Sequence, residues 1–438
     1  MKYYSTNGKA PVADLQKAVV KGLAEDRGLY MPEHIKQLPK AFFDHIEDMT
    51  FQEIAYNVAS AFFGEDVDAD ALKDIVYDTL SFDCPVVRVT DQIYTLELFH
   101  GPTLAFKDVG ARFMARLLQY FIRQEASSNG NRRVNVLVAT SGDTGSAVAN
   151  GFLGVDGIHV YVLYPKGKVS PIQECQFTTL GKNITAIEVD GVFDDCQALV
   201  KSAFMDEKLN HHMRLTSANS INVARFLPQA FYYFNAYARM KAQGQADNLV
   251  MCVPSGNFGN ICAALFGHRM GLPIKRFIAA NNANDIFYNY LQTGRYEPKP
   301  SKQTLANAMD VGDPSNFARI YDLYGKSHKA ITALISGATY TDDQIRTAMR
   351  QCYQQSGYVL DPHGACGYQA LQDLLKPGET GVFCETAHPA KFKEKVDDIL
   401  DTDVAIPDRL ASFMRGEKQS VPMTKDFAAF KQYLMTQA

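Results

Sequence analysis

The stretch VNVLVATSGDTGSAVANGFLG, residues 134–154, decides the fold. It opens with a valine-rich apolar run of the length of a buried strand, passes through a loop of small and polar residues, and continues as a helical segment. The same order returns at 248–271, where NLVMCVP precedes SGNFGNICAALFGHRMG. A strand that leads through a short loop into a helix is the building unit of a parallel sheet.

Further apolar runs extend this pattern, and residues 86–99, VVRVTDQIYTLELF, alternate like a strand or hairpin. Strands that alternate with helices predict an α/β fold with doubly wound, mostly parallel sheets. Such sheets bind ligands at the carboxyl ends of their strands. The additional strands are predicted at HVYVLYP (159–165), ITAIEVDG (184–191), RFIAANN (276–282) and TGVFCET (380–386).

The 438 residues exceed the usual size of one domain, so we expect two α/β domains and an N-terminal region. Residues 1–85 are predicted to be mainly helical, because DHIEDMTFQEIAYNVASAFFG spaces its apolar residues at helical intervals. Residues 86–230 are assigned to a smaller domain that carries the SGDTG loop, with Lys107 at the domain interface. Residues 231–438 are assigned to a larger domain that carries the SGNFGN loop.

The composition argues against several classes of function. A net charge of −4 without a basic block argues against nucleic-acid binding. Because there is neither a spanning run of roughly 20 apolar residues nor a signal-peptide core, we expect a cytoplasmic protein without a membrane partner. The eight cysteines lack metal-ligand spacings, which predicts reduced thiols and no metal. FLPQAFYYFNAYARM (226–240) is interpreted as a core or subunit-interface helix, in a monomer or homodimer.

Two loops between strands and helices are candidate anion sites. In SGNFGN (255–260), two glycines allow close backbone approach, and the amides that start the following helix favour a phosphate. The loop lacks the Walker A and GxGxxG patterns, and a plain strand-to-helix turn remains the alternative. TSGDTGSA (140–147) suits a carboxylate or second phosphate, or is a capped helix start. Asp143 fits there better if it faces a hydroxyl or a cationic group.

Lys107 lies in LFHGPTLAFKDVG (98–110), where the helix GARFMARLLQYFIRQ begins. The helix macrodipole disfavours a cation at that end. Lys107 is therefore either a surface lysine with a buried stem or an amine that loses its charge readily, since desolvation and the dipole both favour the neutral form. A neutral lysine can form a Schiff base, and together with a phosphate-binding loop it suggests pyridoxal phosphate.

Taken together, these motifs make the chain resemble the threonine synthases of the longer bacterial and fungal branch. The matching segments keep the family's order over nearly the whole chain. Two positions depart from the pattern: Arg27 stands where glycine is usual, and Gly364 where threonine or alanine is usual. The resembling segments are GLAEDRGLYMPE, LFHGPTLAFKDVGARFMARLL, ATSGDTGSA, YPKGKVSPIQECQ, NSINVARFLPQ, VPSGNFGN, NAMDVGDPSN and ETAHPAKF.

The resemblance implies a tryptophan synthase β-like, fold-type II pyridoxal-phosphate enzyme. Lys107 would carry the cofactor as a Schiff base, Asp143 would face its 3′-oxygen, and Thr386 would bond its pyridine nitrogen. Ser141 and Thr144 would seat the substrate carboxylate. The cofactor phosphate would be held by the amides of Gly256, Asn257, Phe258, Gly259 and Asn260, and the substrate phosphate by the weaker candidates Lys168, Asn222 and Arg225.

The implied reaction converts O-phospho-L-homoserine and water into L-threonine and phosphate, the last step of threonine biosynthesis. Lys107 would act as both acid and base, and two phosphates would have to be held. The alternatives are another fold-type II lyase, such as a serine or threonine dehydratase or a phospho-amino-acid lyase, and a non-catalytic protein that binds pyridoxal phosphate.

Overall fold

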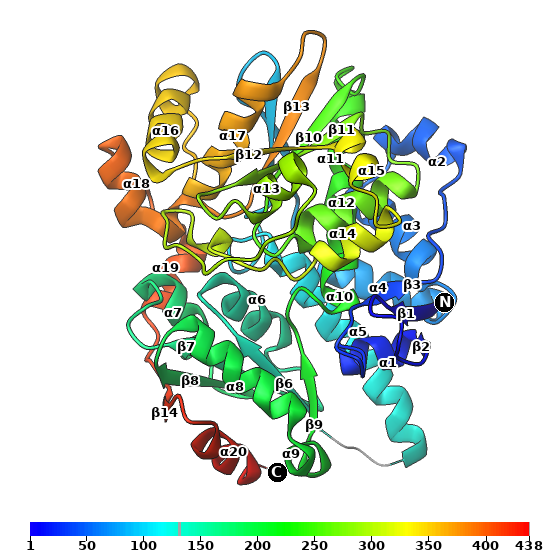
Figure 1. Cartoon of the computed structure of the whole chain (residues 1–438), viewed down its shortest axis with the longest axis vertical. Coiled ribbons are helices and arrows are strands. Elements are labelled where there is room, and N and C mark those ends of the chain that lie inside the picture. The colour runs from blue at the N-terminus through cyan, green and yellow to red at the C-terminus, as the bar shows by residue number, and fades with distance from the viewer. Residues whose placement is uncertain (130–132, 438) are drawn as a thin grey trace. The chain divides into compact units, whose positions relative to one another are not determined.

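The computed structural model describes residues 1–129 and 133–437, and the chain forms two compact units (Figure 1). Each unit is assembled from separate segments of the chain, and one boundary between the units falls directly before Lys107. The first unit contains Met1, Met31–Phe106 and Phe226–Ile406, and the second contains Lys2–Tyr30, Lys107–Arg225 and Pro407–Ala438.

These units differ from the three consecutive regions predicted from the sequence. The hairpin region before Phe106 belongs to the first unit, whereas the chain from Pro407 onward belongs to the second. Hydrophobic periodicity reports the local element and carries no information on which distant segments share a core. The predicted domains were therefore consecutive stretches of the chain, whereas each unit of the structure combines segments that are far apart in sequence.

The first unit is built on a six-stranded sheet with the order β12-β11-β10-β13-β5-β4. All neighbours are parallel except β4 and β5, which form the antiparallel hairpin predicted from alternation. The central strands β10 and β13 are buried along their whole length, as expected for a sheet that is covered on both faces. The strands are β4 (Val86–Arg88), β5 (Ile93–Glu97), β10 (Leu249–Pro254), β11 (Arg276–Asn281), β12 (Ile335–Thr339) and β13 (Thr380–Glu385).

The second unit contains a parallel five-stranded sheet with the order β14-β8-β7-β6-β9. The opening stretch supplies its strand β6 and its helix α6, as predicted. Of the strands in the two large sheets, the sequence prediction missed β9 and β14 here and β12 in the first unit, and these three lie at sheet edges. The strands are β6 (Val134–Ala139), β7 (Ile158–Pro165), β8 (Ile184–Asp190), β9 (Arg214–Ser217) and β14 (Val421–Thr424).

The N-terminal 85 residues are less helical than predicted. Three short strands precede the helices: β1 (Lys2–Ser5), β2 (Ala13–Asp14) and β3 (Tyr30–Pro32). Elements of two to four residues are too short to show a hydrophobic period, which is why the sequence prediction missed them. The predicted helical part is present as α3 (Phe51–Phe63), which starts with a capping box between Thr50 and Glu53.

The remaining helices flank the two sheets. The aromatic helix α11 (Ala230–Ala242) is buried and packs on α3 and α12 within the first unit, which confirms a core helix. No helix of the described residues is long and apolar enough to cross a membrane. Besides α3 and α11, the first unit contains the helices α2 (Lys40–His45), α4 (Ala69–Thr79), α12 (Gly259–Arg269), α13 (Ile286–Thr293), α14 (Phe317–Leu323), α15 (His328–Leu334), α16 (Asp342–Ser356), α17 (Pro362–Leu374) and α18 (Lys393–Leu400).

The helices of the second unit include the long helix that begins at Lys107. In addition, α10 (Val223–Phe226) follows β9, whereas the 3₁₀ helix η3 (Asn307–Met309), which matters for the site, belongs to the first unit. The helices of the second unit are α1 (Leu15–Lys21), α5 (Lys107–Asn129), α6 (Asp143–Phe152), α7 (Pro171–Thr178), α8 (Phe193–Met205), α9 (Glu207–His212), α19 (Asp408–Met414) and α20 (Phe427–Met435).

Arg27 adopts a left-handed backbone conformation with φ of +67°. It lies in a turn in which its amide donates to the carbonyl of Ala24 at 2.9 Å and the Ala24 amide donates to Gly28 at 3.1 Å. A residue with a Cβ pays roughly 1–2 kcal/mol in this conformation, whereas glycine adopts it freely. The turn therefore explains why glycine is usual at this position.

Replacing Arg27 with glycine is expected to raise the free energy of unfolding by roughly 0.5–1 kcal/mol, because the relief of left-handed strain exceeds the added entropy of the unfolded chain. Arg27 is exposed, so few contacts are lost. Chemical denaturation followed by circular dichroism measures the change. The matched control Arg27→Ala keeps the Cβ and should bring no gain; an equal gain in both variants would contradict the strain argument.

Candidate functional site

The SGNFGN loop joins β10 to α12 in the first unit. Its residue Phe258 is the N-cap of α12 and has a φ of +68°, a left-handed conformation that is unusual for a residue with a side chain. The Phe258 side chain is 2% exposed and packs on Phe287 with the ring centroids 4.6 Å apart. This packing holds a strained turn that aims the loop amides outward from the helix start.

The loop amides provide a set of free donors. Among residues 1–129 and 133–437, no acceptor is hydrogen-bonded to the backbone amides of residues 256–260. A Cβ at Gly256 would lie 2.9 Å from the carbonyl oxygen of Ala308 and 3.0 Å from Cα of Met309, so only glycine fits against η3. Free amides at a helix start, beside glycines that let a ligand approach the backbone, fit a phosphate group. The loop therefore suits the phosphate of the predicted cofactor.

Residues after η3 hold the same loop from another side. The Asn316 amide donates to the carbonyl of Asn257 at 3.1 Å, and the Ser315 hydroxyl donates to its side-chain oxygen at 3.1 Å. Arg319 in turn donates to the Asn316 side chain at 2.8 Å. Burial lowers the pKa of Arg319 to about 10, so the guanidinium keeps its charge at neutral pH. These residues lie in the quoted segment NAMDVGDPSN or just after it, yet no role had been predicted for them.

The side chain of Asn260 forms hydrogen bonds within the loop and is not available to a ligand. Its Nδ2 donates to the carbonyl of Pro254 at 2.9 Å, and its Oδ1 accepts from the Ile261 amide at 2.9 Å. Tyr233 donates its hydroxyl to the Asn260 carbonyl at 3.0 Å. The predicted contribution of Asn260 to a phosphate site is thus available only from its backbone amide.

Thr386 follows β13 and is buried with 6% exposure. Its carbonyl accepts from the Phe106 amide at 2.8 Å, and Ala105 forms an antiparallel bridge with Ala387. Phe106 is the residue directly before Lys107. The backbone that leads into the lysine is therefore attached to the carboxyl end of β13, where the sequence prediction places Thr386.

A buried lysine strengthens this attachment. Lys391, 1% exposed, donates from Nζ to the carbonyl of Thr103 at 2.9 Å. The His388 amide donates to the carbonyl of Leu104 at 2.9 Å, and Leu104 has a left-handed φ of +61°. The segment ETAHPAKF therefore contributes a positioning lysine that the sequence analysis did not single out.

In the second unit, Lys107 is the first residue of α5, as predicted. Its Nζ donates to Oγ1 of Thr144 at 2.7 Å, and both side chains are half-buried. Thr144 lies in the first turn of α6. The structure thus brings together two residues that the sequence analysis had assigned separately, the amine to the cofactor and the hydroxyl to the substrate.

The loop before α6 is organised by Thr140, which no prediction included. Its Oγ1 accepts from the amides of Gly142 at 2.9 Å and Gly145 at 2.8 Å. A Cβ at Gly145 would lie 2.5 Å from Cγ2 of Thr140, and Gly142 has a φ of +149°. Both glycines are therefore required by the loop itself, which accounts for the pattern TSGDTG without any ligand.

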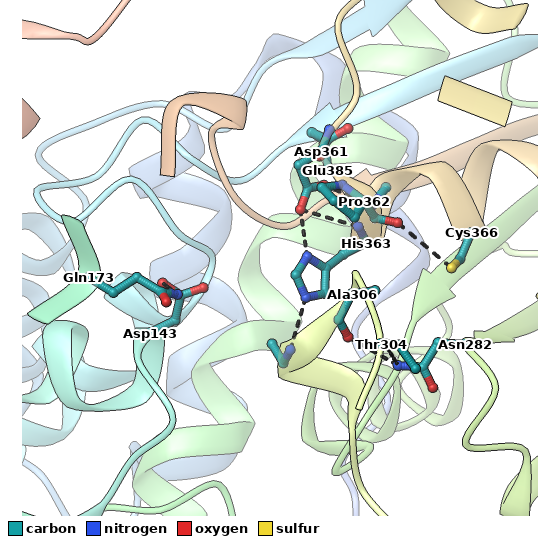
Figure 2. A network of polar contacts seen from close by, with 12 residues as sticks. Asp143, Gln173, Asn282, Thr304, Ala306, Asp361, Pro362, His363, Cys366 and Glu385 are labelled. Atoms are coloured by element: carbon teal, nitrogen blue, oxygen red, sulfur yellow. Dashed lines mark hydrogen bonds and ion pairs between the residues drawn. The ribbon is translucent and has the colours of Figure 1, made fainter. Parts of the chain in front are cut away.

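Asp143 is buried and accepts from Nε2 of Gln173 at 3.2 Å (Figure 2). Ser170 donates its hydroxyl to Oε1 of Gln173 at 3.1 Å, which fixes the amide so that its NH₂ group faces Asp143. The partner seen for Asp143 is thus a protein amide. Gln173 and Ser170 belong to the quoted segment YPKGKVSPIQECQ, but their role was missed because neither residue titrates or acts as a nucleophile.

The other predicted substrate residues have different surroundings. Ser141 is half-buried at the start of the same loop, and Lys168 is exposed. Asn222 is buried and donates to the carbonyls of Val19 at 2.9 Å and Ser217 at 3.1 Å.

Arg225 is also buried and donates from Nη1 to the carbonyl of Ala218. Both Asn222 and Arg225 therefore bind backbone around β9 in this structure. Among the described residues, no group of three or more His, Cys, Asp or Glu side chains is placed to hold a metal ion, and the eight cysteines are free thiols.

Comparison with known proteins identifies the family. Residues 86–383 match the family described as pyridoxal-phosphate dependent enzyme, residues 2–80 match the threonine synthase N terminus, and residues 364–434 match the threonine synthase C-terminal family. The chain is 43% identical to the threonine synthase of Haemophilus influenzae, over 99% of this chain and 100% of that protein. It is 42% identical to the threonine synthase of Escherichia coli, over 99% of each.

Solved structures agree. The crystal structure of Escherichia coli threonine synthase matches with a TM-score of 0.92 at 42% identity over 100% of both chains. The structure of threonine synthase from Brucella melitensis with pyridoxal phosphate bound matches with a TM-score of 0.93 at 33% identity, over 100% of this chain and 99% of that one. The predicted fold class and cofactor are confirmed, and the chain belongs to the threonine synthase family of pyridoxal-phosphate-dependent enzymes.

Proposed function

We propose that this protein converts O-phospho-L-homoserine and water into L-threonine and phosphate. The observation that carries the proposal is the Lys107 amine, held at 2.7 Å by the Thr144 hydroxyl at the start of α6. A half-buried lysine at a helix start, with its amine held by a hydrogen bond, is suited to lose its proton and act as a base. The full-length identity to threonine synthases supports the choice of reaction.

The cofactor, when bound, supplies an electron sink for the charge that develops when a proton leaves the substrate carbon. The amides of residues 256–260 would hold its phosphate, and Lys107 would be its attachment point. Thr386, at the end of β13, would bond the pyridine nitrogen through its hydroxyl, and Asp143 would lie toward the 3′-oxygen. The free amides of the loop support the first assignment most directly.

Once released by substrate, the Lys107 amine would take protons from Cα and Cβ and deliver protons to Cγ, where phosphate leaves, and back to Cα, after water has added its hydroxyl at Cβ. Thr144 is placed to orient the amine during these transfers, because its hydroxyl already accepts a hydrogen bond from Nζ. Ser141, in the same loop, would bind the substrate carboxylate together with Thr144. For the substrate phosphate, exposed Lys168 is our first candidate, since Asn222 and Arg225 would first have to leave their backbone partners.

Incubation with O-phospho-L-homoserine should release phosphate and threonine in a ratio of about one to one, as expected for a single elimination and hydration sequence. Amino-acid analysis and a phosphate assay on the same samples give the ratio. Formation of 2-oxobutyrate in place of threonine would favour the dehydratase alternative, and cofactor binding without any product would favour a non-catalytic protein.

Lys107→Ala should remove both the visible absorbance of the bound cofactor and the release of phosphate, with a loss of activity of at least about 10³-fold. Absorbance spectra and steady-state assays of purified protein measure the two effects. Lys166→Ala, an exposed lysine in the loop after β7, is the matched control and should keep the spectrum. Full activity of the Lys107 variant would overturn the proposal.

Thr144→Val should lower kcat about 10- to 100-fold while the cofactor stays bound, because the nearly isosteric side chain removes the hydroxyl that orients Lys107 and that would also bind the substrate carboxylate. Thr144→Ser keeps the hydroxyl and should stay within a few-fold of the parent enzyme. Steady-state kinetics together with the cofactor spectrum separate the loss of orientation from loss of cofactor. Equal effects of the two substitutions would show that the hydroxyl does not matter.

A further inference from the structure

Glu385, the last residue of β13, buries its carboxyl group in the first unit. It is fully buried, and no lysine, arginine or histidine of the described residues forms an ion pair with it. Oε1 accepts from the Asp361 amide at 3.3 Å, whereas Oε2 has no hydrogen-bond partner among the described residues. A carboxylate without a cation is costly to bury, so this geometry favours the protonated acid.

The carboxyl of Glu385 occupies the space that a side chain at position 364 would fill. A Cβ at Gly364 would lie 2.2 Å from Oε2 of Glu385 and 2.6 Å from Oε1. Both atoms belong to the end of the Glu385 side chain, which is enclosed and cannot move into solvent. The absence of a side chain at position 364, one of the two departures noted in the sequence, is therefore a structural requirement of Glu385.

Asp361, next to Glu385, begins a chain of hydrogen bonds toward the SGNFGN loop (255–260). It is the N-cap of α17, and its Oδ2 lies 2.6 Å from Nδ1 of His363 (Figure 2). Nε2 of His363 accepts from the Ala308 amide at 3.1 Å, so the proton of a neutral ring is on Nδ1 and faces Asp361. The carbonyl of the same Ala308 contacts Gly256, the second residue of the loop.

The two carboxyl groups have opposite tendencies: Glu385 favours its neutral form and Asp361 its charged form. Burial and the neighbouring Asp361 charge raise the pKa of Glu385 well above its ordinary value. Burial also favours neutral Asp361, but its interactions with His363, Glu385 and the Gly364 amide lower its pKa below the ordinary value. The other titratable groups near Glu385 are Glu97 on β5 and Tyr358, whose hydroxyl donates to Glu97 at 2.6 Å.

We infer that Glu385 is a positioning residue: its neutral carboxyl, accommodated by Gly364, holds the Asp361–His363–Ala308 chain against the phosphate loop and so tightens the grip on the cofactor. The residues of this chain touch neither the cofactor phosphate nor the reacting atoms. The inference rests on the proposed role of residues 256–260, and it adds a source of cofactor affinity about 130 residues away in sequence from that loop.

The charge state is tested by Glu385→Gln, which replaces the protonated acid with a neutral isostere. Because the native pKa is raised, the parent protein loses stability as pH rises above the unfolded value of about 4.5, whereas the glutamine variant has no such loss. The melting temperature of the variant should match the parent near pH 4.5 and exceed it by about 1–3 °C at pH 8. A variant that melts lower than the parent as pH rises would show that Glu385 is ionised.

The positioning role is tested by the dissociation constant of pyridoxal phosphate, measured by titrating the apoenzyme in full-length variants. Glu385→Ala should weaken binding about 3- to 10-fold, Glu385→Gln should stay within about twofold, and adding Glu385→Ala to His363→Ala should have little further effect. Gly364→Ala should weaken binding, and Gly364→Ala combined with Glu385→Ala should bind better than Gly364→Ala alone.

Two controls separate positioning from general stability and from the loop assignment. Ile345→Ala removes a buried side chain of the same core on α16 and should lower the melting temperature without changing cofactor affinity. Gly256→Ala should weaken cofactor binding directly. If Gly256→Ala weakens binding and Glu385→Ala does not, the positioning role is wrong; if neither does, the loop assignment fails as well.

Discussion

The hydrogen bond from the Phe106 amide to the Thr386 carbonyl is the constraint on which the lysine depends. It attaches the residue before Lys107 to the carboxyl end of a central strand, where an open α/β sheet binds its ligands. Without this bond, the first turn of α5 would begin from a free loop. Lys107 follows directly, and within the second unit its amine donates to Thr144. Lys391 holds the same segment through a hydrogen bond from its buried amine to the carbonyl of Thr103.

The SGNFGN loop leaves the backbone amides of residues 256–260 available to a ligand, while several side chains in and around both loops hold the loops themselves. Asn260 closes its turn, Thr140 accepts two amides, and Asn257 is held by the residues after η3. Fixed amides need no reorganisation when an anion arrives, and they carry no net charge that would have to be neutralised in its absence. In these loops, most polar groups are therefore backbone amides and uncharged side chains, and few are titratable side chains.

The sequence was sufficient for the central strands, the helix after Lys107 and the two strand-to-helix loops, because buried strands and strand–loop–helix units have strong local signals. It failed at the sheet edges: β9, β12 and β14 are short and carry polar residues, so they lack an apolar run. It also failed for residues that act through others, such as Gln173, Lys391 and Glu385. Their roles depend on contacts between segments far apart in the chain, and no local pattern reports such contacts.

The close fit between Gly364 and Glu385 also makes the two positions depend on each other unequally. A chain with any side chain at 364 has no room for glutamate at 385, since the Cβ alone would lie 2.2 Å from the carboxyl. Loss of the side chain at 364 opens only a cavity, which a protein tolerates at moderate cost. In this packing the glycine is therefore compatible with a smaller residue at 385, whereas the glutamate requires the glycine.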